Sequence, residues 1–298
     1  MRLKIKQFDV RSMKPHRVTY FIGRRGTGKT TLLLDVLGQL ADRFDVALAM
    51  SPTEDTLQEF RKIVPGPFVF EAMNSTKVDE LIDTQRRTAA AKPESVRSAA
   101  LLWDDLMYER GVMNTTSMRE LHFNGRHSKI AFFNSVQYLM DVPPSIRSQV
   151  DYVFCCRETI MSNKVKLHKY FFGIVDTYQE FSSILDACTQ DYCVLVLDCT
   201  QVTSNVEDCL FWYKANPSPP PFRLCRPDYW RWSAEYGKSA DEVERERFLG
   251  RRAGGGAGGG GGGSSGSKKK DAMVVERRGA DGRVLPEDAA GGDVVLLK

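Results

Sequence analysis

Several signatures that would assign the 298-residue chain to a familiar class are missing from it. It has no N-terminal signal peptide and no apolar run long enough to cross a bilayer, so neither secretion nor a membrane anchor is expected. It has no Cys-x-x-Cys pair, which leaves a zinc ribbon without support. Its 42 basic and 38 acidic residues nearly balance, and the net charge of +4 permits a polyanionic partner without arguing for one.

The cysteines also argue against a disulfide framework. They number seven, an odd count, and Cys155, Cys156, Cys193 and Cys199 lie within apolar, strand-like runs. This pattern predicts buried, reduced thiols in an intracellular protein. The hydrophobic content of 42% and charged content of 27% are ordinary for a soluble globular chain of one or two domains.

A phosphate-binding loop occupies residues 23–30, which read Gly-Arg-Arg-Gly-Thr-Gly-Lys-Thr and match G-x-x-x-x-G-K-[ST]. A strand-like run at 18–22 precedes it and a leucine-rich helical run at 31–37 follows it, as such a loop requires. The glycines let N–H groups face phosphate oxygens, the lysine reaches the outer phosphates, and the last hydroxyl can ligate Mg²⁺. The chain is therefore predicted to bind ATP or GTP through Gly23, Arg24, Arg25, Gly26, Thr27, Gly28, Lys29, Thr30 and Thr31.

Strand-like and helical runs alternate through the first 235 residues, which predicts a mainly parallel sheet flanked by helices. Apolar residues at helical spacing favour helices around 57–64 and 78–82. The expected fold class is α/β, a P-loop NTPase of the RecA/ASCE type, with its strand order left open. Besides 18–22, apolar runs favour strands at 46–50, 68–70, 99–103, 130–134, 150–156 and 193–197.

The C-terminal part of the chain changes in composition. A proline-rich run at 216–221 is expected to be extended and to end the compact domain. The NTPase domain is predicted to span 1–235, followed by a short charged helix or linker at 236–252. Residues 253–298 predict a glycine/serine-rich and basic disordered tail, since such a tract buries too little apolar surface to become ordered. Lysines 268–270 favour a solvated tail over a nucleic-acid contact.

Two adjacent carboxylates follow the run at 99–103 and are candidates for the acidic half of the site. Asp104 would orient the metal shell, and Asp105 would polarise the attacking water. Asp176 and Asp198 also follow apolar runs and remain alternatives, although a surface turn is the simpler role for Asp198.

Gln137 ends the next strand-like run. Because the carboxyl ends of parallel strands face the ligand, its amide can meet the γ-phosphate or the attacking water and so act as a sensor. The alternative is a polar residue that merely ends a strand.

Longer segments carry a resemblance to a known family. They are residues 119–127 (Arg-Glu-Leu-His-Phe-Asn-Gly-Arg-His), the run ending in Gln137-Tyr138, and residues 142–154 (Val-Pro-Pro-Ser-Ile-Arg-Ser-Gln-Val-Asp-Tyr-Val-Phe). With Ser-Pro-Thr at 51–53 and Phe-Trp-Tyr-Lys-Ala at 211–215, they resemble the DNA-packaging ATPases of poxviruses and other large nucleocytoplasmic DNA viruses, in the FtsK–HerA branch of P-loop ATPases. The resemblance covers roughly residues 15–216.

The resemblance implies a ring-forming motor that uses ATP and Mg²⁺ to drive double-stranded DNA into a preformed capsid. Its partners would be further copies of the chain and a capsid or portal-vertex protein, and its place the host cytoplasm, the viral factory or the virion. By position, Lys29 and Thr30 contact phosphate and metal, Asp104 orients the metal, and Gln137 is the sensor. The second acid is often Glu in the wider group, so the shorter Asp105 leaves the role of base open.

Arg126 resembles the arginine that precedes the sensor strand in FtsK-like motors, which implies an arginine finger acting across a subunit boundary. Arg147 is the rival for that role. For each arginine, simple pairing with a carboxylate is an equal alternative.

A motor that grips any DNA sequence is expected to contact phosphates rather than base edges. Lys164, Lys166 and Lys169 lie on a loop or helix after the run at 150–156 and are candidate DNA contacts. An ordinary solvated face is the favoured alternative for them.

Two other functions remain open. One is a HerA-like translocase or helicase outside packaging, and the other is a small-molecule kinase or a nucleotide-dependent switch. The sequence lacks the arginine-rich lid expected of a kinase and the Asn-Lys-x-Asp motif of a GTP switch, which favours the motor.

Overall fold

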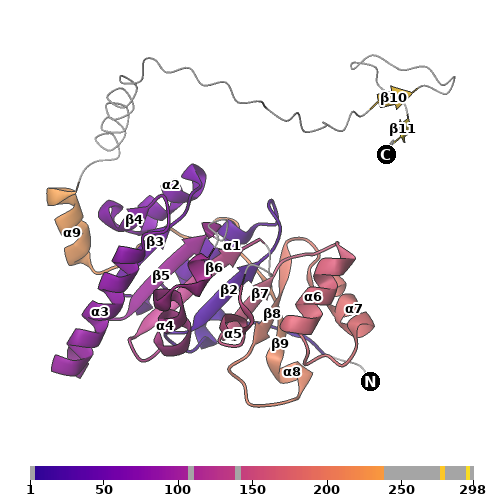
Figure 1. Cartoon of the computed structure of the whole chain (residues 1–298), viewed down its shortest axis with the longest axis horizontal. Coiled ribbons are helices and arrows are strands. Elements are labelled where there is room, and N and C mark those ends of the chain that lie inside the picture. Colours follow the sequence, from indigo (N-terminus) through magenta and orange to yellow (C-terminus); the bar gives the residue numbers. More distant parts are fainter. Residues whose placement is uncertain (1–3, 107–110, 138–141, 238–275, 279–292, 296–298) are drawn as a thin grey trace, which may run out of the picture. The chain divides into compact units, whose positions relative to one another are not determined.

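A nine-stranded, mostly parallel β-sheet forms the centre of the first of two units, Met1–Arg247 and Phe248–Lys298 (Figure 1). The computed structural model describes residues 4–106, 111–137, 142–237, 276–278 and 293–295. The strand order is β1-β9-β8-β7-β2-β6-β5-β3-β4, and of these strands β8 alone runs antiparallel to its neighbours. The predicted α/β fold with a mainly parallel sheet is confirmed.

The strands follow the predicted runs closely, with ends displaced by one or two residues. They are β1 (Lys6–Gln7), β2 (Val18–Ile22), β3 (Val46–Met50), β4 (Val69–Phe70), β5 (Ala99–Asp104), β6 (Ile130–Val136), β7 (Tyr152–Cys155), β8 (Cys193–Asp198) and β9 (Leu210–Lys214). β1 and β9 were not predicted as strands, because β1 is two residues long and β9 is only half-buried over Phe211 and Trp212.

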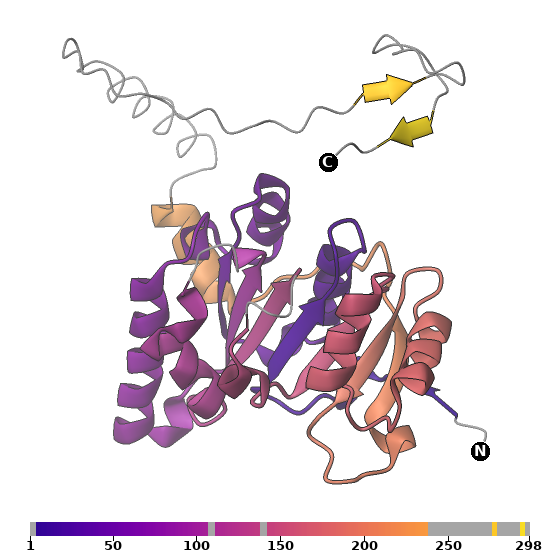
Figure 2. The same ribbon diagram turned by 45° about the vertical axis from the view of Figure 1, so that its right-hand side comes forward.

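Helices cover both faces of the sheet. They are α1 (Lys29–Gln39), α2 (Glu54–Ile63), α3 (Ser75–Ala91), α4 (Thr116–Asn124), α5 (Pro144–Arg147), α6 (Met161–Tyr170), α7 (Tyr178–Cys188), α8 (Val206–Cys209) and α9 (Pro227–Tyr236). Apolar residues of α1 and α2 pack on one face and those of α3 to α8 on the other, and Figure 2 gives a second view of these two layers. Within the described part of the chain, no helix is both long and apolar enough to cross a membrane.

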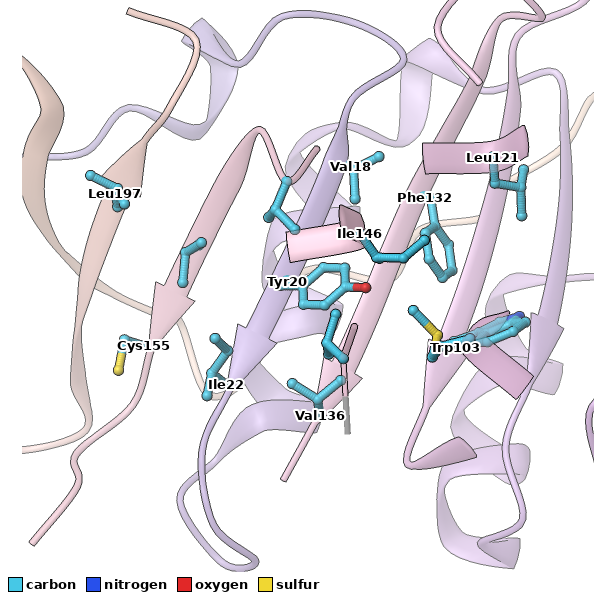
Figure 3. Close-up of a cluster of buried hydrophobic side chains, with 14 of the residues drawn as sticks. Val18, Tyr20, Ile22, Trp103, Leu121, Phe132, Val136, Ile146, Cys155 and Leu197 are labelled. Carbon is cyan, nitrogen blue, oxygen red and sulfur yellow. The ribbon is translucent and has the colours of Figure 1, made fainter. Parts of the chain in front are cut away.

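Alternating side chains supply the two cores, as the period of a β-strand requires. In β2, Tyr20 faces the helices α3 to α8, whereas Phe21 faces α1 and α2. Figure 3 shows Tyr20, Trp103 and Phe132 side by side in the first core, with the Trp103 and Phe132 rings 5.2 Å apart and edge to face. Tyr20 and Trp103 are fully buried, and burying each such side chain contributes about 1.5–3 kcal/mol.

The chain does not leave the domain at the proline run, so the prediction of a stop there is wrong. Residues 215–226, which we call the strap, cross the face covered by α1 and α2. Leu224 is fully buried and its N–H donates to the Ile63 carbonyl (2.7 Å), while the Arg226 N–H donates to the Asp45 carbonyl (3.0 Å). The prolines at 217–221 lack the N–H group that a central strand needs, so they cannot continue the sheet. The extended segment that they form still allows Leu224, which follows them, to be buried.

The second unit is described only where β10 (Glu276–Arg278) pairs antiparallel with β11 (Asp293–Val295). These six residues depart from the predicted disordered tail, and β-branched residues at 294 and 295 favour a strand. The rest of the predicted tail, nearly all of the linker at 236–252 and the lysines at 268–270 lie outside the described residues.

Candidate active site

The carboxyl ends of β7, β2, β6 and β5 lie side by side, and we call this rim of the sheet the carboxyl edge. The phosphate-binding loop follows β2, and Gln137 follows β6. Asp104 ends β5, and Cys156 follows β7. The fold therefore brings the loop, the acids and the predicted sensor to one edge. Parallel α/β sheets bind their ligands at this edge.

Glycines give the loop its shape. Gly26 (φ 78°) and Gly28 (φ 85°) have left-handed backbones that suit glycine. A Cβ at Gly23 would lie 2.6 Å from Thr27 Oγ1 and 2.7 Å from the Cβ of Cys156, so no larger residue fits without a shift. Gly28 is the N-cap of α1, which has no acidic residue in its first turn and no side chain bonded to its cap, and the free N–H groups there favour an anion.

Lys29 begins α1 and is 8% exposed. Its Nζ donates to the Arg24 carbonyl at 3.1 Å, and the same carbonyl accepts from Thr27 Oγ1 at 2.7 Å. The ammonium is therefore held inside the loop by a neutral oxygen, which a phosphate oxygen can replace with a stronger, charge-assisted bond.

Asp104 lies on the same face of the sheet as α1 and α2. Leu102, two residues earlier in β5, packs in the core of that face, and residues two apart share a face. The carboxylate is 5% exposed and accepts a hydrogen bond from Thr56 Oγ1 of α2 (2.9 Å). Thr30 is in the first turn of α1, and α1 packs on the same face of the sheet as Asp104.

These residues fit a Mg²⁺ ion that is bound mainly through nucleotide phosphates. Ser135, which pairs with Asp104 across β5 and β6, is fully buried, and its Oγ has no hydrogen-bond partner. A buried hydroxyl without a partner beside a carboxylate suits a water of a metal shell. Mg²⁺ usually takes one or two protein oxygens, and the described residues hold no group of three or more His, Cys, Asp or Glu that would bind a metal unaided.

Asp105 and Gln137 are in direct contact. Asp105 has a left-handed backbone (φ 56°), and its N–H donates to the Ser135 carbonyl (3.2 Å). Gln137 is exposed, and its Nε2 donates to Asp105 Oδ2. Asp tolerates this backbone conformation better than most residues, and the turn carries the carboxylate to the open side of the edge.

Asp198 and Asp176 lie away from the site. β8 runs antiparallel to β7, and Asp198 pairs with Tyr152, so it lies at the opposite, amino edge, where it accepts from the Thr200 N–H (2.8 Å). Asp176 is exposed between α6 and α7. Neither is adjacent to the loop, so Asp104 and Asp105 are the candidate acids at this edge.

The two candidate finger arginines differ in exposure. Arg126 is exposed in the turn between α4 and β6, at the amino edge. It is near Asp151. Burial raises the pKa of the Asp151 carboxyl, and the positive charges of Arg17 and Arg126 oppose this rise. Arg147 is 8% exposed, and its guanidinium carbon lies 4.0 Å from the centre of the Tyr170 ring. Arg126 is therefore open to a neighbouring molecule, whereas Arg147 is packed inside its own chain.

The three candidate lysines of α6 do not share one face. Lys164 is 8% exposed, and its Nζ lies 2.6 Å from Asp186 Oδ2 and 3.1 Å from Ser182 Oγ. Neither the candidate DNA contact nor the favoured solvated face describes it in this conformation. Lys166 is half-buried in a small pocket with Gly23 and Gln137. Lys169 is exposed and remains a candidate. Residues two apart on a helix point in nearly opposite directions, so Lys164 and Lys166 cannot lie on one face, which the alternation of lysines in the sequence does not show.

Sequence reasoning missed several residues around the loop. Thr56 binds Asp104, and Ser135 lies opposite it. Cys156 packs on Gly23, and burial raises the pKa of its thiol, although the Thr27 hydroxyl and Lys29 act in the opposite direction. Glu158 lies at the same edge, but its carboxylate accepts the N–H groups of Thr159 and Ile160, just before α6. The only sequence signal for Ser135 and Cys156 was their place at strand ends.

Two viral proteins are similar to this chain in sequence. Protein 088R of Invertebrate iridescent virus 3 is 32% identical over 226 residues, which cover 72% of this chain and 85% of that protein. Protein 015R of Frog virus 3 (isolate Goorha) is 30% identical over 228 residues, or 74% and 68% of the two chains.

A solved structure shares the fold. The genome packaging NTPase B204 from Sulfolobus turreted icosahedral virus 2, in complex with AMPPCP, matches 68% of this chain and 100% of its own with a TM-score of 0.50 and 15% identity. The model of the family described as poxvirus A32 protein matches residues 5–204. The chain therefore belongs to the poxvirus A32 protein family.

Proposed function

We propose that this protein is a viral genome-packaging ATPase, which hydrolyses ATP with Mg²⁺ to move double-stranded DNA into a capsid. One observation carries the proposal. In a chain of the poxvirus A32 family, the phosphate-binding loop and the Asp104, Asp105 and Gln137 side chains meet at one carboxyl edge. The genome packaging role of B204, which has the same fold, supports it.

Each residue has a distinct part in the proposed reaction. The loop N–H groups and Lys29 bind the phosphates, and Thr30 and Asp104 hold the metal. When bound, Mg²⁺ neutralises charge on the phosphate oxygens. Asp105 accepts the proton of the attacking water, and Gln137 orients Asp105 through its hydrogen bond.

The proposed motor is a ring of identical chains. Arg126 lies at the amino edge, whereas the loop lies at the carboxyl edge, so Arg126 cannot reach the nucleotide of its own chain in this conformation. An exposed arginine there suits an arginine finger that reaches the phosphates of the next subunit. A capsid or portal-vertex protein is the proposed further partner, in the host cytoplasm, the viral factory or the virion.

The test is ATP and GTP hydrolysis with and without long duplex DNA. The wild-type chain is expected to hydrolyse ATP faster with DNA, and Lys29→Ala to lose hydrolysis under both conditions. Hydrolysis stimulated by a small acceptor and not by DNA would favour a kinase and contradict the proposal. Stimulation by DNA without binding to capsid or portal protein would favour a HerA-like translocase outside packaging.

A further inference from the structure

Tyr192 is an exposed aromatic residue that the proposed reaction does not use. Its side chain is 76% exposed, yet its Cδ1 lies 3.6 Å from the position that a Cβ would take at Gly28. The ring therefore lies against the phosphate-binding loop with most of its surface in solvent. An open aromatic surface at this distance from a phosphate site is suited to stack on a flat ligand.

The backbone holds this ring at the carboxyl edge. Asp191 (φ 50°) and Tyr192 (φ 61°) are both left-handed, and the Cys193 N–H closes the turn on the Gln190 carbonyl (2.8 Å). Two successive left-handed residues other than glycine are unfavourable, and such conformations concentrate at ligand sites. β8 starts immediately after this turn, and because it is antiparallel to β7 its start lies beside the loop.

The strap begins next to Tyr192. Cys193 pairs with Lys214 at the end of β9, so the strap leaves the sheet at the same edge as the Tyr192 turn. It then forms one wall of an open groove of about 830 Å³, within the size range of small-molecule sites. The other walls come from the start of α1 and from α2; the lining includes Thr30, Thr31, Leu34, Pro217, Pro219 and Pro221.

The groove suits an uncharged, flat group more than a phosphate. Its walls include proline rings and Leu34. Of its three charged residues, Glu59 and Lys62 form an ion pair with each other (2.6 Å), and the guanidinium carbon of Arg223 lies 4.5 Å from the centre of the Trp230 ring. The loop takes the phosphates, so the remainder of a nucleotide has to lie beyond Gly28 and Thr31, where Tyr192 and the groove are found.

We infer that the base and ribose of a bound nucleoside triphosphate lie between Tyr192 and the proline-rich part of the strap, with the Tyr192 ring stacked on the base. This inference rests on the proposed function only in requiring that the loop binds a triphosphate. It makes Tyr192 a binding residue and gives the strap a part in the nucleotide site.

The test compares two ligands that share phosphates but not a base. Dissociation constants of ATP and of inorganic tripolyphosphate are measured by calorimetry, with Mg²⁺, for the full chain and its variants. Tyr192→Ala is expected to weaken ATP at least about fivefold, the lower end of the effect of losing an aromatic–base stack, and to leave tripolyphosphate unchanged. Tyr192→Phe keeps the ring and is expected to bind both ligands normally. Alanine, like tyrosine, carries a Cβ. The energetic cost of the left-handed backbone at this position is therefore not reduced in Tyr192→Ala.

Phe123→Ala, which removes an exposed aromatic ring near the end of α4, on the amino-edge side of the sheet, serves as the matched control. Equal weakening of ATP and tripolyphosphate by Tyr192→Ala would overturn the inference, because the ring would then support the loop rather than the base. Unchanged ATP affinity would overturn it too, while the loss of both ligands in Lys29→Ala would leave the proposed function standing. Failure of the wild-type chain to bind either ligand would overturn both proposals together.

Discussion

Gln137 donates its side-chain amide to the carboxylate of Asp105. The two residues come from the ends of the neighbouring strands β6 and β5, and the Asp105 N–H is bonded to the Ser135 carbonyl of β6 as well. One strand end thus fixes both the backbone and the side chain of the proposed base. Because Gln137 is exposed, its amide can exchange Asp105 for another acceptor, such as water or a phosphate oxygen.

Asp105→Asn is expected to keep ATP binding and to lower hydrolysis at least about a hundredfold, the usual scale for a lost general base. Asparagine retains the shape and can still accept a hydrogen bond from Gln137, but it cannot take a proton. The measurements are the turnover number and the dissociation constant of ATP. Normal turnover in this variant would place the base elsewhere.

Gln137→Ala is expected to reduce turnover by a smaller factor than Asp105→Asn, because it removes the group that orients the base and not the base itself. The double variant should then be little slower than Asp105→Asn alone, since residues that act as a unit are not additive. If the factors by which the two substitutions reduce turnover multiply instead, Gln137 acts on the nucleotide independently of Asp105.

Gly23→Ala is expected to weaken nucleotide binding by about tenfold or more. The new Cβ would lie within 2.7 Å of the side chains of Thr27 and Cys156, and relieving such overpacking costs about 1–3 kcal/mol. Gly66→Ala is the matched control, because a Cβ at Gly66 meets nothing within 4 Å. Equal ATP affinity in both variants would mean that the loop is free to adjust.

Mixed rings test the role of Arg126. Subunits carrying Lys29→Ala are combined in varying ratios with subunits carrying Arg126→Ala, each inactive alone. Some interfaces then pair an intact loop with an intact arginine, so partial recovery of hydrolysis is expected. No recovery at any ratio counts against a finger acting in trans, and the same mixture made with Arg147→Ala should show no more hydrolysis than the sum of its two components.

Lys164 and Lys169 are expected to respond differently to the loss of charge. Lys164→Met removes the partner of Asp186, whose side chain is 48% exposed, and should lower the free energy of unfolding by about 1 kcal/mol in urea titrations. Lys169→Met should change stability little but weaken DNA-stimulated hydrolysis and its dependence on salt. Unchanged stimulation would remove Lys169 from the DNA contacts.

His122 should make the domain sensitive to acid. Its Nδ1 donates to the Met118 carbonyl (2.6 Å), so its Nε2 accepts from the Tyr20 hydroxyl (2.9 Å) as a neutral ring. Burial lowers the pKa of His122 from 6.5 to about 4. Between these values the unfolded chain binds the proton and the folded chain does not, so stability should fall on acidification, by up to about 3 kcal/mol. Unfolding of wild type and His122→Gln at pH 7 and pH 5 checks this, with a smaller pH dependence expected in the variant.

The sequence was most informative where a pattern repeats or a motif has a fixed geometry. Seven apolar runs became strands, because buried parallel strands need continuous apolar residues such as those of β5 and β6. The glycine pattern placed the loop, and its flanking strand and helix followed. Asp105 and Gln137 were identified separately, but their contact depends on β5 and β6 being neighbours, which no local pattern encodes.

The remaining features depend on contacts distant in sequence. Lys164 looked like a surface lysine because Asp186 is on another helix. The strap looked like a stop because its prolines precede Leu224, whose burial depends on α2. Tyr192 carries no motif at all, and only the antiparallel direction of β8 brings it to the loop.

The pairing of β1 with β9 has a consequence for the order of assembly. Lys6 and Gln7 pair with Phe211 and Trp212, and the Phe8 N–H donates to the Trp212 carbonyl (2.8 Å). During synthesis β1 is made about two hundred residues before β9 and has no sheet neighbour until β9 follows. A nascent domain truncated before β9 would therefore leave β1 unpaired.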